Sequence, residues 1–307
     1  MTHTEKEILS QPELWERALE QSREVAGQLK ELAGSGMALV GAGSSYYVGI
    51  AAARYLNAVG VAAARAVPAS EFAPRAGELV LCISRSGTTT EILEAVSAAK
   101  EAGNVTLALT AEPASPLAQE THEVISLAYV REDSVVQTGS ATTAMLLLRA
   151  AADLLAGRVP PVHLPEELRR SLAEDVEPLA QHDHVVVLGS SWRLGVACEA
   201  ALKLQEMAQL WTERYVPLEY RHGPISCAGP RTHVEILDPW DERIGALTAD
   251  IQRVGARVRV AAADPLVELV RLQRVGLKTA LRRGLNPDKP RHLTRSVVLP
   301  TEPAPAT

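Results

Sequence analysis

Short apolar runs and longer periodic stretches alternate along the first half of the chain. The runs are uninterrupted, as is typical of strands buried on both faces of a parallel sheet. They predict strands at Met37–Gly41, Val61–Val67, Leu79–Ile83, Val105–Thr110 and Val124–Ala128. Apolar positions at helical spacing predict helices over Pro12–Leu32, Thr88–Ala102 and Ser140–Ala156, and a helix of small residues that ends at Ala58. This alternation predicts an α/β fold with a doubly wound parallel sheet.

The pattern stops at a proline-rich stretch and then starts again. Gly157–Pro165, with Pro160 and Pro161, has the composition of a linker. Beyond it the spacing predicts helices at Glu166–Ala180 and Leu194–Trp211, and strands at His184–Leu188, Val234–Leu237, Val258–Ala263 and Val297–Leu299. We therefore divide the chain into an N-terminal helix (1–34), two α/β domains in tandem (35–157 and 158–300) and a disordered tail (301–307).

A weak internal repeat supports this division. Shifting the first half by 146 positions places Gly43-Ser44-Ser45 on Gly189-Ser190-Ser191, Gly49 on Gly195 and Ala51 on Ala197. Both copies lie at a predicted strand-to-helix junction, and the shift is close to half the chain. We interpret the match as two related α/β units.

Composition narrows the class of function. The chain has 307 residues and a net charge of −6, which provides no basic field for a nucleic acid. Its three cysteines have no metal-type spacing and are typical of free thiols in a reducing compartment. The N-terminus lacks the features of a signal peptide, and no apolar run has the length needed to cross a bilayer. These features predict a cytoplasmic protein without a membrane partner.

Two turns rich in hydroxyl groups follow predicted strands and lead into helices. Ser84, Arg85, Ser86 and Thr89 follow Leu79–Ile83, and Ser44 with Ser45 follows the first strand. Free backbone N–H groups, the positive end of a helix and hydroxyl donors together suit a phosphate. The alternative is that these residues only cap helices. A dinucleotide site is disfavoured, because Tyr46 stands where the third glycine of that fingerprint would be.

Three charged residues interrupt an apolar helix further along. Glu199, Lys203 and Glu206 share one face of the predicted helix. They are either an ordinary surface ion-pair ladder or charges that face a cavity. His222 lies in a tight turn, Tyr220–Pro224, and a lone histidine of this kind is more often structural than catalytic.

Taken together and in this order, Ser-Arg-Ser-Gly-Thr-Thr-Thr-Glu, Glu-Ala-Ala-Leu-Lys-Leu-Gln-Glu and Tyr-Arg-His-Gly-Pro resemble the sugar isomerase (SIS) family. The likeness is greatest to the isomerase half of glucosamine-6-phosphate synthase and to its stand-alone relatives. It implies two flavodoxin-like domains, each a doubly wound parallel sheet in an αβα sandwich. It also implies a homodimer with a shared active site, a sugar phosphate as ligand, and no metal or organic cofactor.

The resemblance also implies roles for individual residues. The sugar phosphate would be held by Ser44, Ser45, Ser84, Arg85, Ser86 and Thr89, and Ser140 would contact the sugar. Glu206 would move the proton between C1 and C2, with Lys203 as a nearby cation, and His222 of the neighbouring subunit would open the ring.

The sequence departs from the synthase in three ways. Arg85 stands where the synthase has a glutamine, and Arg295 stands where it has a lysine that forms a Schiff base. An arginine cannot form that imine, although it can stabilise charge. The glutamine-hydrolysing domain is absent from these residues. We therefore expect an isomerase of hexose or hexosamine 6-phosphates, with or without deamination. The alternatives are a regulatory sugar-phosphate sensor and an aminotransferase subunit that works with a separate glutaminase.

Overall fold

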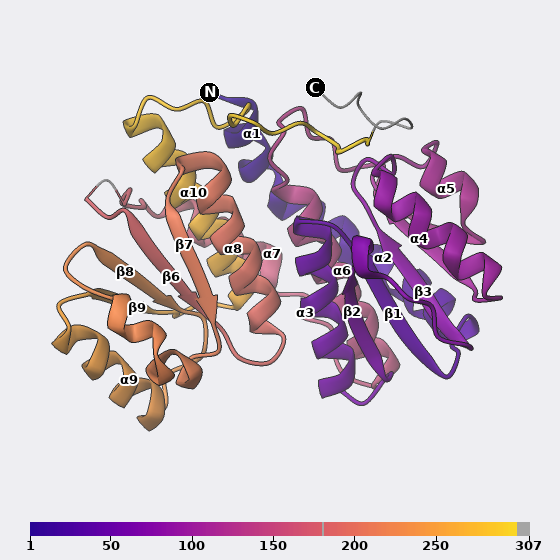
Figure 1. Ribbon diagram of the computed structural model, residues 1–307, viewed down its shortest axis with the longest axis horizontal. Coiled ribbons are helices and arrows are strands. Elements are labelled where there is room, and N and C mark those ends of the chain that lie inside the picture. The colour runs from indigo at the N-terminus through magenta and orange to yellow at the C-terminus, as the bar shows by residue number, and fades with distance from the viewer. Residues whose placement is uncertain (180, 300–307) are drawn as a thin grey trace, which may run out of the picture.

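The computed structural model describes residues 1–179 and 181–299, and it contains two parallel sheets separated by helices (Figure 1). The first sheet has the order β2-β1-β3-β4-β5. Its strands are β1 (Gly36–Gly41), β2 (Ala64–Pro68), β3 (Glu78–Ile83), β4 (Thr106–Thr110) and β5 (Glu123–Ser126). This is the flavodoxin-like order, and the chain reverses direction across the sheet between β1 and β3. The predicted α/β class is therefore confirmed.

The second sheet repeats this arrangement with one strand fewer. Its order is β7-β6-β8-β9, and every pairing is parallel. The strands are β6 (His184–Leu188), β7 (Trp211–Tyr215), β8 (Thr232–Ile236) and β9 (Arg257–Val260). The first strand of each sheet thus lies second from one edge, as expected for two related units.

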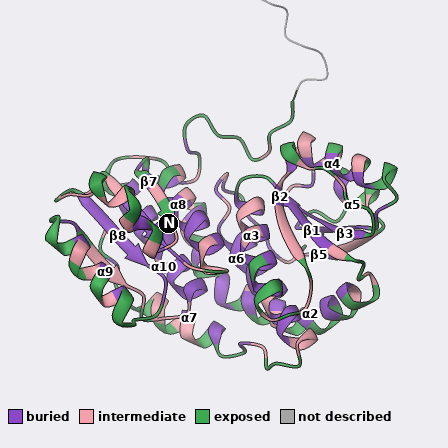
Figure 2. Ribbon diagram, turned by 60° about the horizontal axis from the view of Figure 1, so that its bottom comes forward, coloured by how far each residue is buried: buried purple, intermediate pink, exposed green. Residues whose placement is uncertain are grey.

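The helices form a shared central block and two outer layers. The central helices are α2 (Gln11–Glu31), α3 (Ser44–Ala58), α6 (Gly139–Leu155), α7 (Leu164–Ala173), α8 (Arg193–Ala208) and α10 (Pro265–Arg282). Their apolar side chains join one continuous core that touches both sheets, seen as the buried centre of Figure 2. Outside lie α4 (Thr90–Glu101) and α5 (Pro116–Glu120) on the first sheet and α9 (Glu242–Arg253) on the second, while α1 (His3–Leu9) packs on α10. None of the helices within the described residues is long and apolar enough to cross a membrane.

Two positions of the internal repeat have a packing explanation. A Cβ atom added at Gly195 of α8 would lie 2.7 Å from the Cα and Cβ of Ala51 in α3, so these helices cross in close contact. The equivalent Gly49 rests on β1, where an added Cβ would lie 3.4 Å from the carbonyl oxygen of Leu39. Small residues at this crossing let the two halves of the chain approach each other.

The structure corrects several of the predicted elements. Val297–Leu299 is not a strand, because its backbone bonds to Thr90 at the start of α4 and not to a sheet. The predicted helix Leu194–Trp211 ends at Ala208, where Gln209 adopts a left-handed conformation (φ 52°). Trp211 instead begins β7, which was not predicted. The predicted helix to Ala180 ends at Ala173, and the predicted tail, 301–307, lies outside the described residues.

Residues 285–299, here called the C-terminal strap, run from the end of α10 across to the first sheet (Figure 1). Asp288 accepts hydrogen bonds from the backbone N–H groups of His3 (3.0 Å) and Thr4 (2.8 Å), and its carbonyl accepts one from Val135 (2.9 Å). Through Asp288, the strap is therefore bonded to α1 and to the loop before α6.

Candidate active site

The two hydroxyl-rich turns lie side by side at the carboxyl edge of the first sheet. Residues 42–45 follow β1 and begin α3, while residues 84–89 follow β3 and begin α4. β1 and β3 are neighbouring parallel strands, so both turns emerge at the point where the strand order reverses. Ligands of open parallel sheets bind at this point.

Glycines make the turn after β1 compact. A Cβ atom at Gly41 would lie 2.6 Å from the carbonyl oxygen of Ser45, and Gly43 has a φ of 55°, which favours glycine. The chain therefore turns sharply into α3 and places Ser44 and Ser45 in its first turn, where both side chains are buried. Their hydroxyl groups lie next to the free N–H groups of the helix end.

The 84–89 turn is held by its own hydroxyl groups. The Ser84 hydroxyl accepts a hydrogen bond from the N–H of Gly87 (3.1 Å), and the Ser86 hydroxyl accepts one from the hydroxyl of Thr88 (3.1 Å). Gly87 has a φ of 62°, and a side chain there would collide with Ser115. Thr89 is the N-cap of α4, but its side chain makes no capping hydrogen bond. Its hydroxyl is therefore available to a ligand.

Arg85 and Ser140 are joined by a carboxylate that the sequence did not reveal. Glu132 is fully buried, accepts a hydrogen bond from the Ser140 hydroxyl (2.6 Å) and pairs with the Arg85 guanidinium (3.3 Å). Although burial opposes ionisation, Arg85 and the Ser140 hydrogen bonds hold the pKa of Glu132 below its ordinary value. Arg85 therefore faces Glu132 in this structure and presents no free fork to a phosphate.

The charged face of α8 is buried. The Lys203 side chain is 0% exposed, donates to Glu206 and lies 3.5 Å from Glu199, while Glu206 is 18% exposed. Although burial by itself would lower the pKa of Lys203, Glu199 and Glu206 raise it above its ordinary value. We call these three residues the carboxylate–lysine triad. Three charged side chains on a buried helix, one of them partly exposed, are typical of a functional site. Because Glu199 and Lys203 are buried, the triad is not the ordinary surface ion-pair ladder of the alternative interpretation.

The Glu199 carboxyl is the most perturbed member of the triad. Burial raises the pKa of Glu199 to about 7, and Glu206 adds to this effect, while Lys203 and the Ser44 hydroxyl act against it. Neither of its oxygens accepts a hydrogen bond of normal geometry from the described residues. Helix α8 packs on α3, and the Ser44 hydroxyl at the start of α3 acts on the Glu199 carboxyl, so the triad lies beside the turn after β1.

His222 lies away from this group within a single chain. It ends a short 3₁₀ segment, Leu218–His222, that follows the carboxyl end of β7. That end of β7 pairs with the end of β6, where α8 begins, whereas Glu206 lies in the last turn of α8. At 1.5 Å per residue, the two ends of α8 are roughly 20 Å apart. His222 is exposed.

The C-terminal strap crosses the opening between the turns and the triad. On one side, a cavity of about 530 Å³ is lined by Glu206, Gln205 and the strap residues 290–293. On the other, a cavity of about 400 Å³ is lined by Ser86, Thr88, Arg295 and Ser296. Arg295 donates to the carbonyl of Glu132 and lies 3.4 Å from Glu112. Ser45, Arg85 and Ser140 meet beneath in a cavity of about 10 Å³, which holds one water at most.

The equivalent turn of the second sheet is closed to anions. The backbone N–H of Ser190 donates to Asp238 (2.8 Å), and the Ser190 hydroxyl donates to the same carboxylate. These donors are satisfied by the chain's own negative charge, so an incoming phosphate would be repelled. Of the two turns related by the repeat, only the one in the first half is suited to a phosphate.

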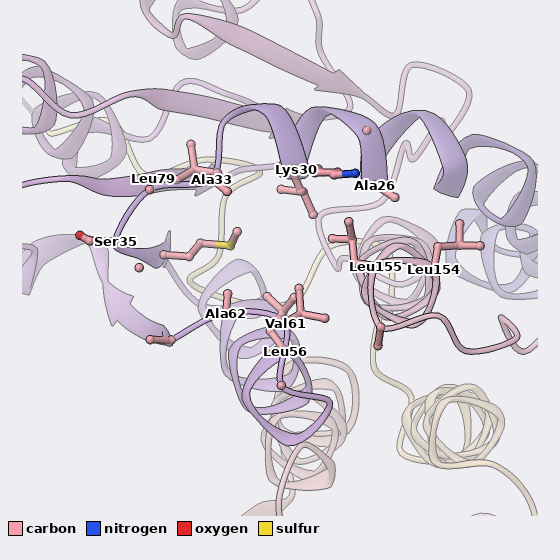
Figure 3. Close-up of a pocket in the computed structure, with 18 of the residues that line it drawn as sticks. Ala26, Lys30, Ala33, Ser35, Leu56, Val61, Ala62, Leu79, Leu154 and Leu155 are labelled. Carbon is pink, nitrogen blue, oxygen red and sulfur yellow. The ribbon is translucent and has the colours of Figure 1, made fainter.

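Another cavity lies elsewhere and contains none of the predicted site residues. It measures about 680 Å³ and opens at the amino edge of the first sheet, between the ends of α2, α3 and α6 (Figure 3). Its labelled lining, including Leu56, Val61 and Leu155, is mainly apolar. Residues 1–179 and 181–299 also contain no cluster of three or more His, Cys, Asp or Glu side chains arranged to hold a metal.

Fold and site together define a class: two-sheet parallel α/β proteins with hydroxyl-rich turns and a buried acid–base helix at one sheet edge. A family model described as SIS domain matches residues 35–154. The solved structure of glucosamine-6-phosphate deaminase from Thermotoga maritima is 31% identical, with a TM-score of 0.86 over 97% of this chain and 100% of that one. The chain therefore belongs to the SIS-domain family.

Other relatives agree with this family. Glutamine–fructose-6-phosphate aminotransferase (isomerizing) from Xylella fastidiosa is 27% identical over 96% of this chain, which spans 58% of that relative's length. Tagatose-6-phosphate ketose/aldose isomerase from Escherichia coli is 23% identical and shares the fold, with a TM-score of 0.82 over 99% of this chain and 97% of that one.

Proposed function

We propose that this chain is an aldose–ketose isomerase of hexose or hexosamine 6-phosphates, and that with an amino sugar the same proton transfer leads to loss of ammonia. The observation that carries the proposal is the placement of the carboxylate–lysine triad beside the Ser44 end of α3. A proton-transfer group and a phosphate-binding edge, contributed by different halves of the chain, thereby face one site.

In this proposal the phosphate is the anchor. The hydroxyl groups of Ser44, Ser45, Ser84, Ser86 and Thr89 donate to it, together with the N–H groups at the starts of α3 and α4. Anchoring the phosphate at C6 leaves the C1–C2 end of an open-chain sugar to reach toward Glu206. Several neutral donors suit a phosphate ester, because they bind it without requiring buried cations.

Glu206 is the proposed base. It removes the proton from C2 of the open-chain aldose, and the same carboxyl returns a proton to C1. Lys203 stabilises the negative charge that develops on the enediol or enolamine oxygen. With an amino sugar, the product of this transfer is an imine at C2. Water adds to that carbon, and ammonia leaves, so that one ketose phosphate and one ammonia form for each water consumed.

Ring opening would require a second copy of the chain. His222 is exposed and lies near the opposite end of α8 from Glu206, so it can act at this site only if a partner subunit brings it there. We therefore propose a homodimer in which each site takes His222 from its neighbour. No metal or organic cofactor enters this scheme.

The deaminating version of the reaction has support of its own. The relative from Thermotoga maritima named above, a glucosamine-6-phosphate deaminase, covers nearly the whole chain at 31% identity. Arg295, where the synthase has its Schiff-base lysine, cannot form an imine with the sugar. An aminotransferase subunit that receives ammonia from a separate glutaminase is the less favoured alternative.

The test is incubation with a panel of hexose and hexosamine 6-phosphates, with ketose and ammonia assayed separately. We expect ketose from at least one of them, and ammonia in equal amount if that sugar carries an amino group. The Glu206→Gln variant serves as the control for contaminating enzymes. If the purified chain binds sugar phosphates but converts none, the regulatory-sensor alternative is correct.

A further inference from the structure

The Arg85 side chain makes hydrogen bonds to two segments that lie far from it in the sequence. It is 2% exposed, although it belongs to the 84–89 turn at the edge of the sheet. Nη1 donates to the carboxylate of Glu132 (3.3 Å) and to the carbonyl of Ser134 (3.3 Å). Nη2 donates to the carbonyls of Val135 (2.9 Å) and of Arg295 in the C-terminal strap (3.2 Å). One guanidinium thus joins the turn, the loop before α6 and the strap.

Glu132, the partner of Arg85 in the ion pair, is itself held by the start of α6. One of its oxygens accepts from the N–H groups of Thr138 (2.8 Å) and Ser140 (3.0 Å), and the other accepts from the Ser140 hydroxyl. The carboxylate is therefore fixed in place by the first turn of α6. A fixed buried carboxylate beside a buried guanidinium leaves Arg85 little freedom to turn outward.

Besides Asp288, other strap residues also bond to the rest of the chain: Arg295 donates to the carbonyl of Glu132, and the Thr88 and Ser296 hydroxyl groups are hydrogen-bonded (2.9 Å). The strap residues from Arg291 to Leu299 are exposed, except for the half-buried Ser296, and they form no helix or strand. Near the 84–89 turn, the N–H of Leu299 donates to the Thr90 hydroxyl (2.9 Å), and the carbonyl of Val297 accepts from the N–H of Thr90 (3.3 Å). These bonds are open to water. Among the strap's contacts, the bond from Arg85 to the Arg295 carbonyl is the one whose donor belongs to a buried ion pair, so this donor is the least free to move.

We propose that Arg85 is a positioning residue: paired with Glu132, it holds the C-terminal strap over the 84–89 turn before any ligand binds. Arg295 and Ser296 are then already in place when a sugar phosphate arrives. This role of the strap in binding rests on the proposed function, whereas the hold of Arg85 on the strap does not.

The chemistry of arginine explains why the residue is needed. A guanidinium presents five donors in a rigid fork, which lets one side chain reach four acceptors in different directions. A lysine offers its donors from a single point, and a glutamine has one NH₂ group and no charge for Glu132. Neither can join the three segments while keeping the buried carboxylate paired.

The first test is hydrogen–deuterium exchange of the strap, measured by mass spectrometry without ligand. We expect peptides that cover residues 290–299 to exchange at least tenfold faster in Arg85→Gln than in the wild type, with no rescue by Arg85→Lys. Arg65→Gln is the matched control. Arg65 also pairs with a glutamate, Glu78 (2.8 Å), but at the amino edge of the same sheet. That variant should leave strap exchange unchanged.

The second test asks whether strap position matters for binding. With the substrate found by the panel above, KM should rise about tenfold in Arg85→Gln while kcat changes less than threefold. Unchanged strap exchange in Arg85→Gln, with only weaker phosphate binding, would overturn the proposal and make Arg85 a direct ligand of the phosphate. Faster exchange in both Arg85→Gln and Arg65→Gln would also overturn it, since general loosening would then be the cause.

If Arg85→Gln does not fold, Glu132→Gln gives the same information, because it keeps the side-chain volume and removes the charge that holds Arg85. Faster strap exchange in that variant supports the proposal, and unchanged exchange contradicts it. The exchange experiment decides the hold on the strap even if no sugar phosphate is turned over, so failure of the proposed function remains distinguishable.

Discussion

A single methyl group placed at Gly195 should push helices α3 and α8, and with them the two halves of the molecule, slightly apart. The Cβ atom of Gly195→Ala would lie 2.3 Å from the backbone nitrogen of Ala51 and 2.7 Å from its Cα and Cβ, whereas ordinary van der Waals contact begins at 3.4 Å. Helices α3 and α8 must therefore move apart by roughly 1 Å. Both partners of the clash include backbone atoms of packed helices, which cannot rotate away. Overpacking of this kind costs about 1–3 kcal/mol in the free energy of unfolding.

The same displacement should reach the site. Ser44 is the first residue of α3, and the triad lies on α8, so the crossing at Gly195 sets the distance between them. Displacements near 1 Å in an active site reduce rates by up to about 10²-fold. We expect Gly195→Ala to lose at least tenfold in kcat with the substrate identified by the panel, in addition to the loss of stability.

Urea denaturation followed by circular dichroism measures the first effect, and Gly27→Ala is its control. Gly27 is also a helical glycine, but an alanine side chain there would have no neighbour within 4 Å. Replacing a glycine inside a helix by alanine should stabilise the protein by about 0.5–1 kcal/mol. The two glycine-to-alanine changes should therefore have opposite signs. If Gly195→Ala is as stable as Gly27→Ala, the close crossing of α3 and α8 is wrong.

The remaining predictions concern the site itself. Glu206→Gln should lower kcat by about 10²–10⁴ while calorimetry finds unchanged affinity for the sugar phosphate, and activity within tenfold of wild type would contradict its role as the base. Burial raises the pKa of Glu199 to about 7 from an ordinary 4.5, so the folded protein binds this proton more tightly than the unfolded chain does. The free energy of unfolding therefore falls as the pH rises from about 4.5 to 7. Glu199→Gln should remove this fall, which amounts to roughly 3 kcal/mol, and equal slopes in urea titrations of both proteins would refute it. Mixed Glu206→Gln and His222→Ala chains should recover about a quarter of wild-type activity after subunit exchange, since half the dimers would hold one intact site; no recovery would place His222 outside a shared site. Ser86→Ala should weaken sugar-phosphate binding by roughly 1–3 kcal/mol, and unchanged affinity with the fold intact would exclude that hydroxyl from the site.

The central strands of the first sheet were predictable because strands buried on both faces need continuous apolar side chains, whereas the half-buried edge strand β2 was predicted at Val61–Val67 and spans Ala64–Pro68. β3 (Glu78–Ile83) is buried along its whole length, and after Glu78 it appears in the sequence as an unbroken apolar run, Leu79–Ile83. β7 was missed for the opposite reason. It is an edge strand in which Trp211 is 72% exposed and the next residue, Thr212, is buried, so its pattern does not resemble that of a central strand.

Some residues of the candidate site were likewise predictable from local sequence, and others were not. Ser44, Ser45, Ser84, Ser86 and Thr89 were found from the sequence, because a hydroxyl-rich turn between a strand and a helix is a local pattern. Glu132 was not found, since a single glutamate in a loop has no local signal that marks it as buried. Glu199 was recognised only as a neighbour of Glu206 on the helix face, and its burial against α3 was not predicted.

The sequence by itself determined the local chemistry: the alternation of most strands and helices, the two hydroxyl-rich turns, and the charged face of α8. These depend on neighbours within a few positions, through alternation, helical spacing and capping. Only the tertiary structure decided which end of α8 meets the first sheet, that Arg85 faces Glu132 instead of the site opening, and that the strap returns to cover the 84–89 turn. Such arrangements join residues as distant as Thr4 and Asp288, and they depend on how the two halves pack around one core. No local pattern encodes them, because the free energy of packing belongs to the whole set of contacting surfaces.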